Sequence, residues 1–246
     1  MGISIEQANV KAAKREIIEK FFSHTGKSYD QVVNLFTFGI DRLWKQNIIE
    51  EIALSFGKTS PKRILDLACG TGILTVLLAE RFPDSEIVGV DISPDYLEVA
   101  WRKVHKKKIK NISFVLAAAE EFSSPTLFDC VTASYLAKYA DLPVLIKNLS
   151  GMIKPAGMLL FHDFIYPTPK SYQRLFEGYF KVAPILGRLF YSEWKEVLYE
   201  LPNVIRETKW VSEIKEALKR EKFSSVTTTT LTMEGAALVS ARRAQQ

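Results

Sequence analysis

The stretch Ile64-Leu65-Asp66-Leu67-Ala68-Cys69-Gly70-Thr71-Gly72 decides the fold of this 246-residue chain. It is an apolar run that leads into a glycine-rich turn, and an amphipathic run follows from Ile73. Glycines let a ligand approach the backbone closely, and the free N–H groups at the start of a helix favour an anionic group. The sequence therefore predicts a strand, a ligand-binding turn and a helix in succession.

Short β-branched or apolar runs alternate with amphipathic runs after this stretch, which is typical of a parallel sheet covered by helices. The predicted strands are residues 63–67, 86–91, 112–117, 128–134 and 158–164. The predicted helices are residues 73–81, 94–105 and 143–152, the second of them capped by Ser93 before Pro94. Residues Lys154-Pro155-Ala156-Gly157 are predicted to form a turn that ends the third helix.

The end of the chain has a different pattern. A helix is predicted at 212–222, followed by a β-hairpin of residues 225–231 and 236–241. An antiparallel hairpin that closes a parallel sheet distinguishes one group of doubly wound folds from the dinucleotide-binding folds. We expect a single domain, with a helical N-terminal cap at 1–55 outside the core, a core at 56–164, a helical insertion at 165–209, and the last helix and hairpin at 210–246.

Composition narrows the class of protein. The formal net charge is +5 and 47% of the residues are hydrophobic, which is typical of a soluble globular protein. The two cysteines, Cys69 and Cys130, do not have a spacing that predicts a disulfide framework or a zinc site, so we expect no metal. The first residues contain no long apolar stretch, so the expected location is cytoplasmic. A small positive charge and no RNA-binding motif disfavour nucleic acid as a partner.

Two carboxylates indicate which ligand the turn holds. A dinucleotide turn would have a third glycine where Thr75 stands, and Asp66 would repel a pyrophosphate. Asp91 ends the second predicted strand, where an acid can accept hydrogen bonds from both ribose hydroxyls. A nucleoside with an amine-bearing group attached satisfies both acids.

The glycine turn and the second-strand acid resemble those of the class I S-adenosylmethionine-dependent methyltransferases. This resemblance implies a Rossmann-like, doubly wound, mostly parallel seven-stranded sheet with a C-terminal antiparallel hairpin. It also implies that Asp66 and the turn hold the methionine part of the cofactor and that Asp91 holds the ribose. The adenine contact is left open, because Ala118 stands where the family often has a polar residue. Glu120, the backbone, or packing against Ile92 are the alternatives. The cofactor-binding residues that the resemblance implies are Tyr29, Asp66, Ala68, Gly70, Gly72, Asp91, Ile92, Ala119, Glu120 and Ser134.

The N-terminal part resembles the ubiquinone/menaquinone biosynthesis C-methyltransferases in particular. The resemblance rests on the aromatic residues from Phe21, the pair Tyr29-Asp30, and the segment Gly39-Ile40-Asp41-Arg42-Leu43-Trp44. It implies that Tyr29 closes over the cofactor, although its ring could instead cap the core. The function it implies is C-methylation of a demethylated, prenylated quinol by S-adenosylmethionine. Two alternatives stay open: methylation of another phenolic or small-molecule acceptor, and a protein that binds S-adenosylmethionine without catalysis.

One segment departs from the family pattern on the acceptor side. Residues 135–139 read Tyr-Leu-Ala-Lys-Tyr, where the family usually has an aromatic-Gly-x-Arg-Asn stretch. Lys138 keeps the positive charge but not the planar fork of arginine. Deprotonation of a phenol activates the neighbouring ring carbon, so we expect His162 or Asp163 as the base and Lys138 as the cation that stabilises the phenolate. Lys138 could alternatively be a solvated loop residue, and His162 could point away from the site.

Two further segments bear on the partners. Residues 165–209 contain nine aromatic residues, which predict either the packed face of two helices or a lid over an apolar tail. Residues 102–110 form a basic run at a helix end, which is either solvated or in contact with an anionic membrane. A prenylated acceptor would require at least transient peripheral contact with the inner membrane face, and a homodimer is the candidate assembly.

Overall fold

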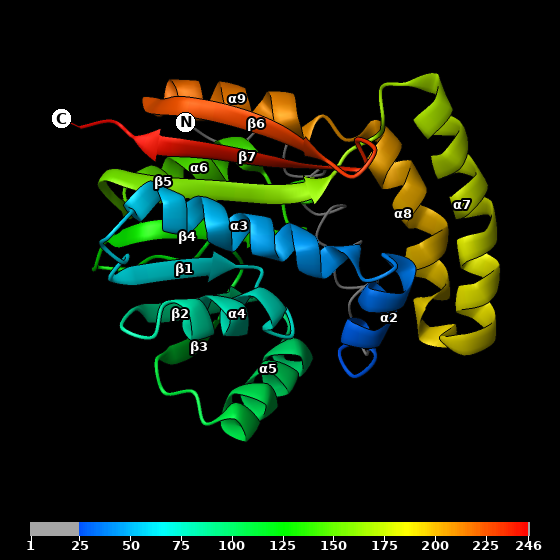
Figure 1. Ribbon diagram of the computed structural model, residues 1–246, viewed down its shortest axis with the longest axis horizontal. Helices are drawn as coiled ribbons and strands as arrows, with labels where there is room; N and C mark the ends of the chain where they lie inside the picture. The colour runs from blue at the N-terminus through cyan, green and yellow to red at the C-terminus, as the bar shows by residue number, and fades with distance from the viewer. Residues whose placement is uncertain (1–24, 246) are drawn as a thin grey trace.

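The structure, a computed structural model, describes residues 25–245 (Figure 1). The strands are β1 (Arg63–Leu67), β2 (Glu86–Asp91), β3 (Ile112–Leu116), β4 (Phe128–Ser134), β5 (Ile153–Phe164), β6 (Phe223–Leu231) and β7 (Ala236–Arg243). The helices are α2 (Tyr29–Phe36), α3 (Ile40–Phe56), α4 (Ile73–Arg81), α5 (Pro94–Lys107), α6 (Leu142–Ser150), α7 (Lys170–Phe190), α8 (Lys195–Glu207) and α9 (Trp210–Arg220), with a short 3₁₀ turn, η1 (Ser192–Trp194), between α7 and α8.

The seven strands form one sheet in the order β3-β2-β1-β4-β5-β7-β6. The first five run parallel, whereas β7 is antiparallel to both β5 and β6. The predicted doubly wound sheet with a closing hairpin is therefore confirmed. The chain order reverses between β1 and β4, and ligands of such sheets bind outside the carboxyl ends of the strands at that point.

Alternation of side chains along the strands gives the sheet an apolar layer on each face. Leu65 and Leu67 of β1 pack with residues of α6 and α9 on one face. Ile64 packs on the opposite face with residues of α3 and α4. Figure 1 shows α3 crossing in front of β4 and β5. Ile48 and Ile52 of α3 are buried against the sheet. The prediction that residues 1–55 lie outside the core is therefore wrong for α3. The predicted helical structure of residues 1–24 lies outside the described residues.

Several predicted boundaries are confirmed to the residue, namely those of β1, β2, β4 and α4. The turn predicted at 154–157 is wrong as a separate element, because β5 begins at Ile153. Phe128 of β4 pairs with Ile153, and the next pair is Cys130 with Met158. Residues 154–157 therefore bulge out of the ladder between β4 and β5. Ala156 has a φ of +62°, as expected of a bulge that bends a strand sharply.

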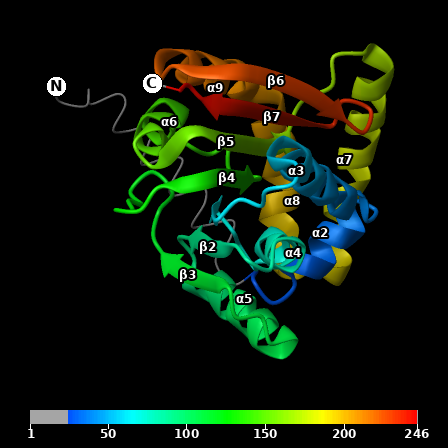
Figure 2. The same ribbon diagram turned by 60° about the vertical axis from the view of Figure 1, so that its left-hand side comes forward.

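The segment between β5 and α9 contains α7, η1 and α8, which pack against one another at the carboxyl edge of the sheet (Figures 1 and 2). Several of its aromatic rings contact each other, as in the pair Phe176 and Phe180, whose centroids are 4.6 Å apart. Trp194 is buried with Val32 of α2. These contacts agree with the prediction that the aromatic residues form the packed face of two helices. None of the aromatic residues of 165–209 lines the two cavities described below.

Candidate active site

Two neighbouring cavities lie at the carboxyl edge of the sheet. The Asp91 cavity contains Asp91 and Glu120 in its wall, and the Asp66 cavity contains Asp66 and Lys45. They share five wall residues, which are Tyr29, Ala68, Gly70, Ser134 and Tyr135. All predicted cofactor-binding residues except Gly72 line one or both cavities. The structure therefore brings these residues together, while the role of each in cofactor binding stays a prediction.

Asp91 organises the glycine turn around the first cavity. Its carboxylate accepts the N–H of Gly70 at 2.7 Å and the N–H of Ser93 at 2.9 Å. One side chain therefore ties the turn after β1 to the start of α5. Burial raises the pKa of Asp91, and these backbone N–H bonds partly oppose that shift.

The two glycines of the turn have different roles. Both have positive φ, +57° at Gly70 and +77° at Gly72, a region that favours glycine. Gly70 lines both cavities. A Cβ at Gly72 would come within 3.1 Å of Ala100 Cβ, so this glycine allows α4 and α5 to pack closely. Gly72 lines neither cavity, and its predicted contact with the cofactor stays a prediction.

Asp66 is buried beneath the second cavity. Its two oxygens accept hydrogen bonds from the hydroxyls of Thr75, at 2.7 Å, and Thr132, at 2.9 Å. Burial raises the pKa of Asp66 to about 6, although both hydroxyls favour the ionised form. The carboxylate is therefore largely ionised at neutral pH and protonates in mild acid.

Tyr29 closes one side of both cavities from the first turn of α2. Its ring centroid lies 5.1 Å from that of Tyr96 and 5.7 Å from that of Trp194. Trp194 donates its indole N–H to Ser28 at 2.9 Å, which ties the 165–209 segment to the start of α2. The N-terminal helices therefore form a wall of the site.

A cluster of acid, base and phenol lies where β4 ends. Tyr135 has a φ of +67° and donates its hydroxyl to Asp41 at 2.7 Å. Asp41 also pairs with Lys45, one helical turn further along α3, and the Lys45 ammonium lies 4.8 Å from the centre of the Tyr135 ring. Tyr135 lines both cavities and Lys45 lines the Asp66 cavity, so this cluster faces the space between them.

The three predicted catalytic residues lie behind the cavity walls. Lys138 and Asp163 form a buried ion pair, with Nζ 2.7 Å from Oδ1. Asp163 also accepts the backbone N–H groups of Lys138, at 3.1 Å, and Phe164, at 2.7 Å. The alternative of a solvated Lys138 is therefore wrong, because its partner is 25 residues away in sequence and buries it. The proposed roles of both residues in catalysis stay predictions.

His162 lies in β5 between the rings of Trp44 and Tyr135. Its Nδ1 is 3.0 Å from the hydroxyl of Ser134, a residue of both cavities. Its Nε2 has no hydrogen-bond partner among residues 25–245. Burial, reinforced by Lys45 and Lys138, holds the pKa of His162 well below its usual value, so the ring is neutral.

The wall residues that sequence reasoning missed include Tyr96, Tyr135 and Lys45. Tyr96 lies in the first turn of α5 and bonds to Thr25 across 71 positions, a contact that local patterns do not reveal. The Asp41 and Lys45 pair has the four-residue spacing of a helical ion pair, so this signal was present. Two of the three adenine alternatives, Glu120 and Ile92, line the Asp91 cavity, and the choice among the three stays open.

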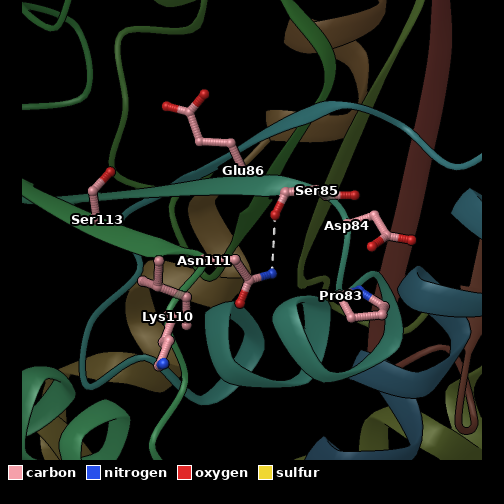
Figure 3. A pocket seen from close by; sticks show the side chains of 8 residues that line it. Pro83, Asp84, Ser85, Glu86, Lys110, Asn111 and Ser113 are labelled. Atoms are coloured by element: carbon pink, nitrogen blue, oxygen red, sulfur yellow. Dashed lines mark hydrogen bonds between the residues drawn. The ribbon is translucent and has the colours of Figure 1, made fainter.

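A further hollow lies at the opposite edge of the sheet, where β2 and β3 begin (Figure 3). Asn111 donates its side-chain amide to the backbone oxygens of Ser85, at 2.9 Å, and Phe82, at 3.3 Å. The amide therefore braces the turn before β2. This hollow is far from the carboxyl edge and shares no wall residue with the two cavities.

Comparison with known proteins identifies the family. The family model of the ubiE/COQ5 methyltransferases matches residues 8–242. The chain belongs to the ubiE/COQ5 methyltransferase family. The ubiquinone/menaquinone biosynthesis C-methyltransferase UbiE of Proteus mirabilis is 30% identical over 227 residues, covering 90% of this chain and 88% of that protein. The demethylmenaquinone methyltransferase of Thermus thermophilus is 33% identical over 187 residues, covering 75% of this chain and 82% of that protein.

Solved structures agree on the fold. The plantazolicin methyltransferase BpumL, in a complex with S-adenosylhomocysteine, aligns with a TM-score of 0.70 at 16% identity and covers 98% of this chain and 100% of that one. Phosphoethanolamine N-methyltransferase 2 of Haemonchus contortus aligns with a TM-score of 0.58 at 17% identity, covering 81% of this chain and 53% of that one. The class I methyltransferase fold, the methyltransferase family and its cofactor S-adenosylmethionine are thus confirmed.

The walls of the cavities fit this cofactor. Among the described residues, no lysine, arginine or histidine lines the Asp91 cavity, whereas the carboxylates of Asp91 and Glu120 do, which disfavours a pyrophosphate. Its acids and aromatic rings suit a nucleoside, and Asp66 next to it suits a cationic amino-acid part. No cluster of three or more metal-binding side chains occurs within residues 25–245. In the same part of the chain, no helix combines the length and the apolarity needed to cross a bilayer.

Proposed function

We propose that this ubiE/COQ5 family member transfers a methyl group from S-adenosylmethionine to a ring carbon of a demethylated, prenylated quinol. The observation that carries the proposal is the position of Tyr135. Its hydroxyl is held by Asp41 at the shared wall of the two cavities, where an acceptor phenol can meet it. The names of the relatives from Proteus and Thermus support a quinone precursor as the acceptor class.

Bound S-adenosylmethionine supplies an electrophilic methyl group. The protein must align the acceptor carbon with it and exclude water. Tyr29 packs against both Tyr96 and Trp194, and this aromatic wall serves to exclude water. The acceptor carbon becomes nucleophilic when the neighbouring phenol loses its proton.

Tyr135 and Asp41 receive that proton in this proposal. The Tyr135 hydroxyl donates to Asp41, so its oxygen lone pairs remain to accept a hydrogen bond from the acceptor phenol. A proton taken from the phenol passes through the Tyr135 oxygen to the carboxylate of Asp41. Lys45 lines the Asp66 cavity and offsets the negative charge that develops on the acceptor oxygen.

His162, Lys138 and Asp163 support this arrangement from behind. Lys138 donates to the backbone oxygen of Tyr135 at 3.1 Å and pairs with Asp163, which fixes the loop that presents Tyr135. His162 reaches the cavities only through the Ser134 hydroxyl. A base role for His162 therefore requires Ser134 as a relay.

Tyr135→Phe is expected to lower kcat about 100-fold, because general-base assistance contributes at least that much. The phenyl ring keeps its stacking on Phe164, whose centroid is 4.9 Å away, so the binding of S-adenosylhomocysteine is expected to stay within about twofold of wild type. Single-turnover methylation and isothermal titration measure the two effects. Ser134→Ala is the matched variant, because it removes the hydroxyl through which His162 would act and leaves Tyr135 in place. Full activity of Tyr135→Phe combined with loss of activity in Ser134→Ala would move the base role to His162.

Cofactor binding is expected to weaken in mild acid. Asp66 must be ionised to hold a cationic amino group, and its pKa is about 6, so binding falls as the pH drops through 6. The association constant of the ligand is expected to fall by up to about tenfold per pH unit near pH 5, since the binding of one proton to Asp66 competes with the binding of the ligand. Titration of S-adenosylhomocysteine between pH 5 and pH 8 measures the slope. Asp66→Asn should bind weakly at every pH without this step, and a flat wild-type profile would exclude Asp66 from the binding site.

An acceptor panel tests the proposed substrate class. Under anaerobic conditions the enzyme is incubated with demethylated naphthoquinols and benzoquinols that carry short prenyl tails, and with simple phenols without tails. Preferential turnover of one quinol series supports the proposal. Turnover of the simple phenols alone would favour another small-molecule acceptor. Cofactor binding without turnover of any compound would favour the non-catalytic alternative.

Location and assembly belong to the same proposal. A prenylated acceptor resides in a membrane, so the enzyme works at least transiently at the surface of the inner membrane, from the cytoplasmic side. A homodimer is kept as the candidate assembly.

A further inference from the structure

Helix α7 exposes an apolar stripe on the side that faces away from the sheet. Six large side chains form the stripe, and each is between 42% and 71% exposed: Leu175, Val182, Ile185, Leu186, Leu189 and Phe190. Successive members are separated by seven or three residues along the helix, or are direct neighbours, so they share one face. A continuous exposed stripe of this size marks an interaction surface.

The charges on α7 have a single sign around this stripe. Lys170, Arg174, Lys181 and Arg188 are all exposed. The one acid of the helix, Glu177, pairs with Arg206 of α8 at 2.7 Å and also accepts the hydroxyl of Tyr166. The outward face of α7 is therefore apolar and cationic. This composition is typical of a helix that lies in the interface of an anionic lipid bilayer.

The position of α7 connects the stripe to the active site. Figures 1 and 2 show α7 at the outer rim of the molecule, beyond the carboxyl edge of the sheet. The side of α7 that carries Ala183 and Gly187 is buried against the protein, and Tyr179, at the border of the stripe, donates its hydroxyl to the backbone oxygen of Phe36 in α2 at 2.7 Å. Tyr29, at the start of α2, lines both cavities. A surface bound to α7 would lie on the acceptor side of the enzyme.

We propose that the outward face of α7 docks the enzyme on an anionic lipid surface. The proposal rests on the proposed function, since a prenylated acceptor would reach the cavities from that surface. The apolar stripe enters the headgroup region, and the four cations contact lipid phosphates. The basic run at the end of α5 is less suited to this role. Two of its lysines, Lys103 and Lys107, are already paired with Asp30 and Glu80.

Charge distinguishes lipid from the other occupants of this face. A second copy that docked through the same face of α7 would add four more cations to the interface and no acid to balance them. Residues 1–24 contain four lysines and arginines against three glutamates, so they offer no negative surplus either. An anionic bilayer complements both the apolar and the cationic parts of the face.

Vesicle co-sedimentation of the full chain tests the docking. Vesicles of 70% phosphatidylcholine and 30% phosphatidylglycerol are compared with pure phosphatidylcholine, without cofactor or acceptor. Wild type is expected to bind the anionic vesicles at least about tenfold more strongly. L186E/L189E is expected to lose at least about tenfold in binding, and K181E/R188E to lose the preference for phosphatidylglycerol. The controls carry the same changes elsewhere: L43E/L54E on exposed α3 leucines and K106E/K108E on the basic run.

Unchanged binding in both control variants supports the proposal. Equal loss in L43E/L54E, or no binding of wild type to either vesicle, overturns it. Light scattering gives a further test, because a wild-type dimer that L186E/L189E converts to a monomer would assign the face to a second copy. A cross-link between Lys181 and residues 1–24 would assign it to the chain itself. Methylation of a short-tailed, soluble quinol does not require docking, so failure of that reaction would overturn the proposed function and not the docking.

Discussion

Asp91→Ala is expected to weaken the binding of S-adenosylhomocysteine about 100-fold. The two hydrogen bonds that the ribose hydroxyls would donate to the Asp91 carboxylate together contribute about 3 kcal/mol to binding. Each 1.4 kcal/mol is a factor of ten in the dissociation constant. The substitution also frees the N–H groups of Gly70 and Ser93, which the carboxylate now holds at 2.7 and 2.9 Å. Isothermal titration calorimetry at pH 7.5 measures the loss.

Asp129→Ala is a matched control for this variant. Asp129 likewise accepts two backbone N–H groups, from Lys62 at 3.0 Å and Arg63 at 2.8 Å, but at the amino edge of the sheet. It should leave cofactor binding within about twofold of wild type while losing similar backbone support. Equal losses in the two variants would mean that Asp91 acts only by bracing the turn.

Lys138→Met is expected to lower the free energy of unfolding by about 3–5 kcal/mol, because it leaves the buried charge of Asp163 without its partner. The pair is fully enclosed, with Nζ and Oδ1 2.7 Å apart. Burial lowers the pKa of Lys138, and Asp163 opposes that shift, so the lysine depends on this partner for its charge. Urea unfolding followed by circular dichroism measures the change.

Two further variants separate the pair from a general effect of the substitution. Lys154→Met removes an ion pair of similar length, 2.8 Å to Asp129, that is partly exposed and should cost less than about 1 kcal/mol. The double variant K138M/D163N should recover about 2 kcal/mol, because it removes the buried charge while the asparagine Oδ1 still accepts one of the two N–H groups, that of Lys138 or that of Phe164. A loss below about 1 kcal/mol in Lys138→Met would contradict a structural role for the pair.

Local patterns predicted the core of the fold because they are strong there. The run from Ile64 to Gly72 combines a buried strand with a turn that requires positive φ, and β4 is likewise a short, mostly buried run. The residues that line the cavities follow from the same logic, since the carboxyl ends of parallel strands meet at one edge. The cofactor half of the site was therefore accessible from sequence.

The acceptor half depends on contacts between distant segments. In the sequence, Lys138 has the surroundings of a loop lysine. In the structure it is buried in an ion pair with Asp163, which lies 25 positions later. Tyr135 meets Asp41 across 94 positions, and no spacing rule connects a residue of α3 with the end of β4. Residues 154–157 were predicted as a turn because they contain proline and glycine. They belong to β5 instead, since pairing with β4 occurs on both sides of the bulge. Long-range packing, and not local propensity, decides these features.

The most direct test of the account is transfer of a labelled methyl group. The enzyme is incubated anaerobically with S-adenosylmethionine that carries a deuterated methyl group and with a demethylated naphthoquinol bearing a short prenyl tail. We expect a product that carries the label on a ring carbon, located by mass spectrometry and carbon NMR. Label on a phenolic oxygen, or no labelled product from an enzyme that binds the cofactor, would contradict C-methylation of a quinol.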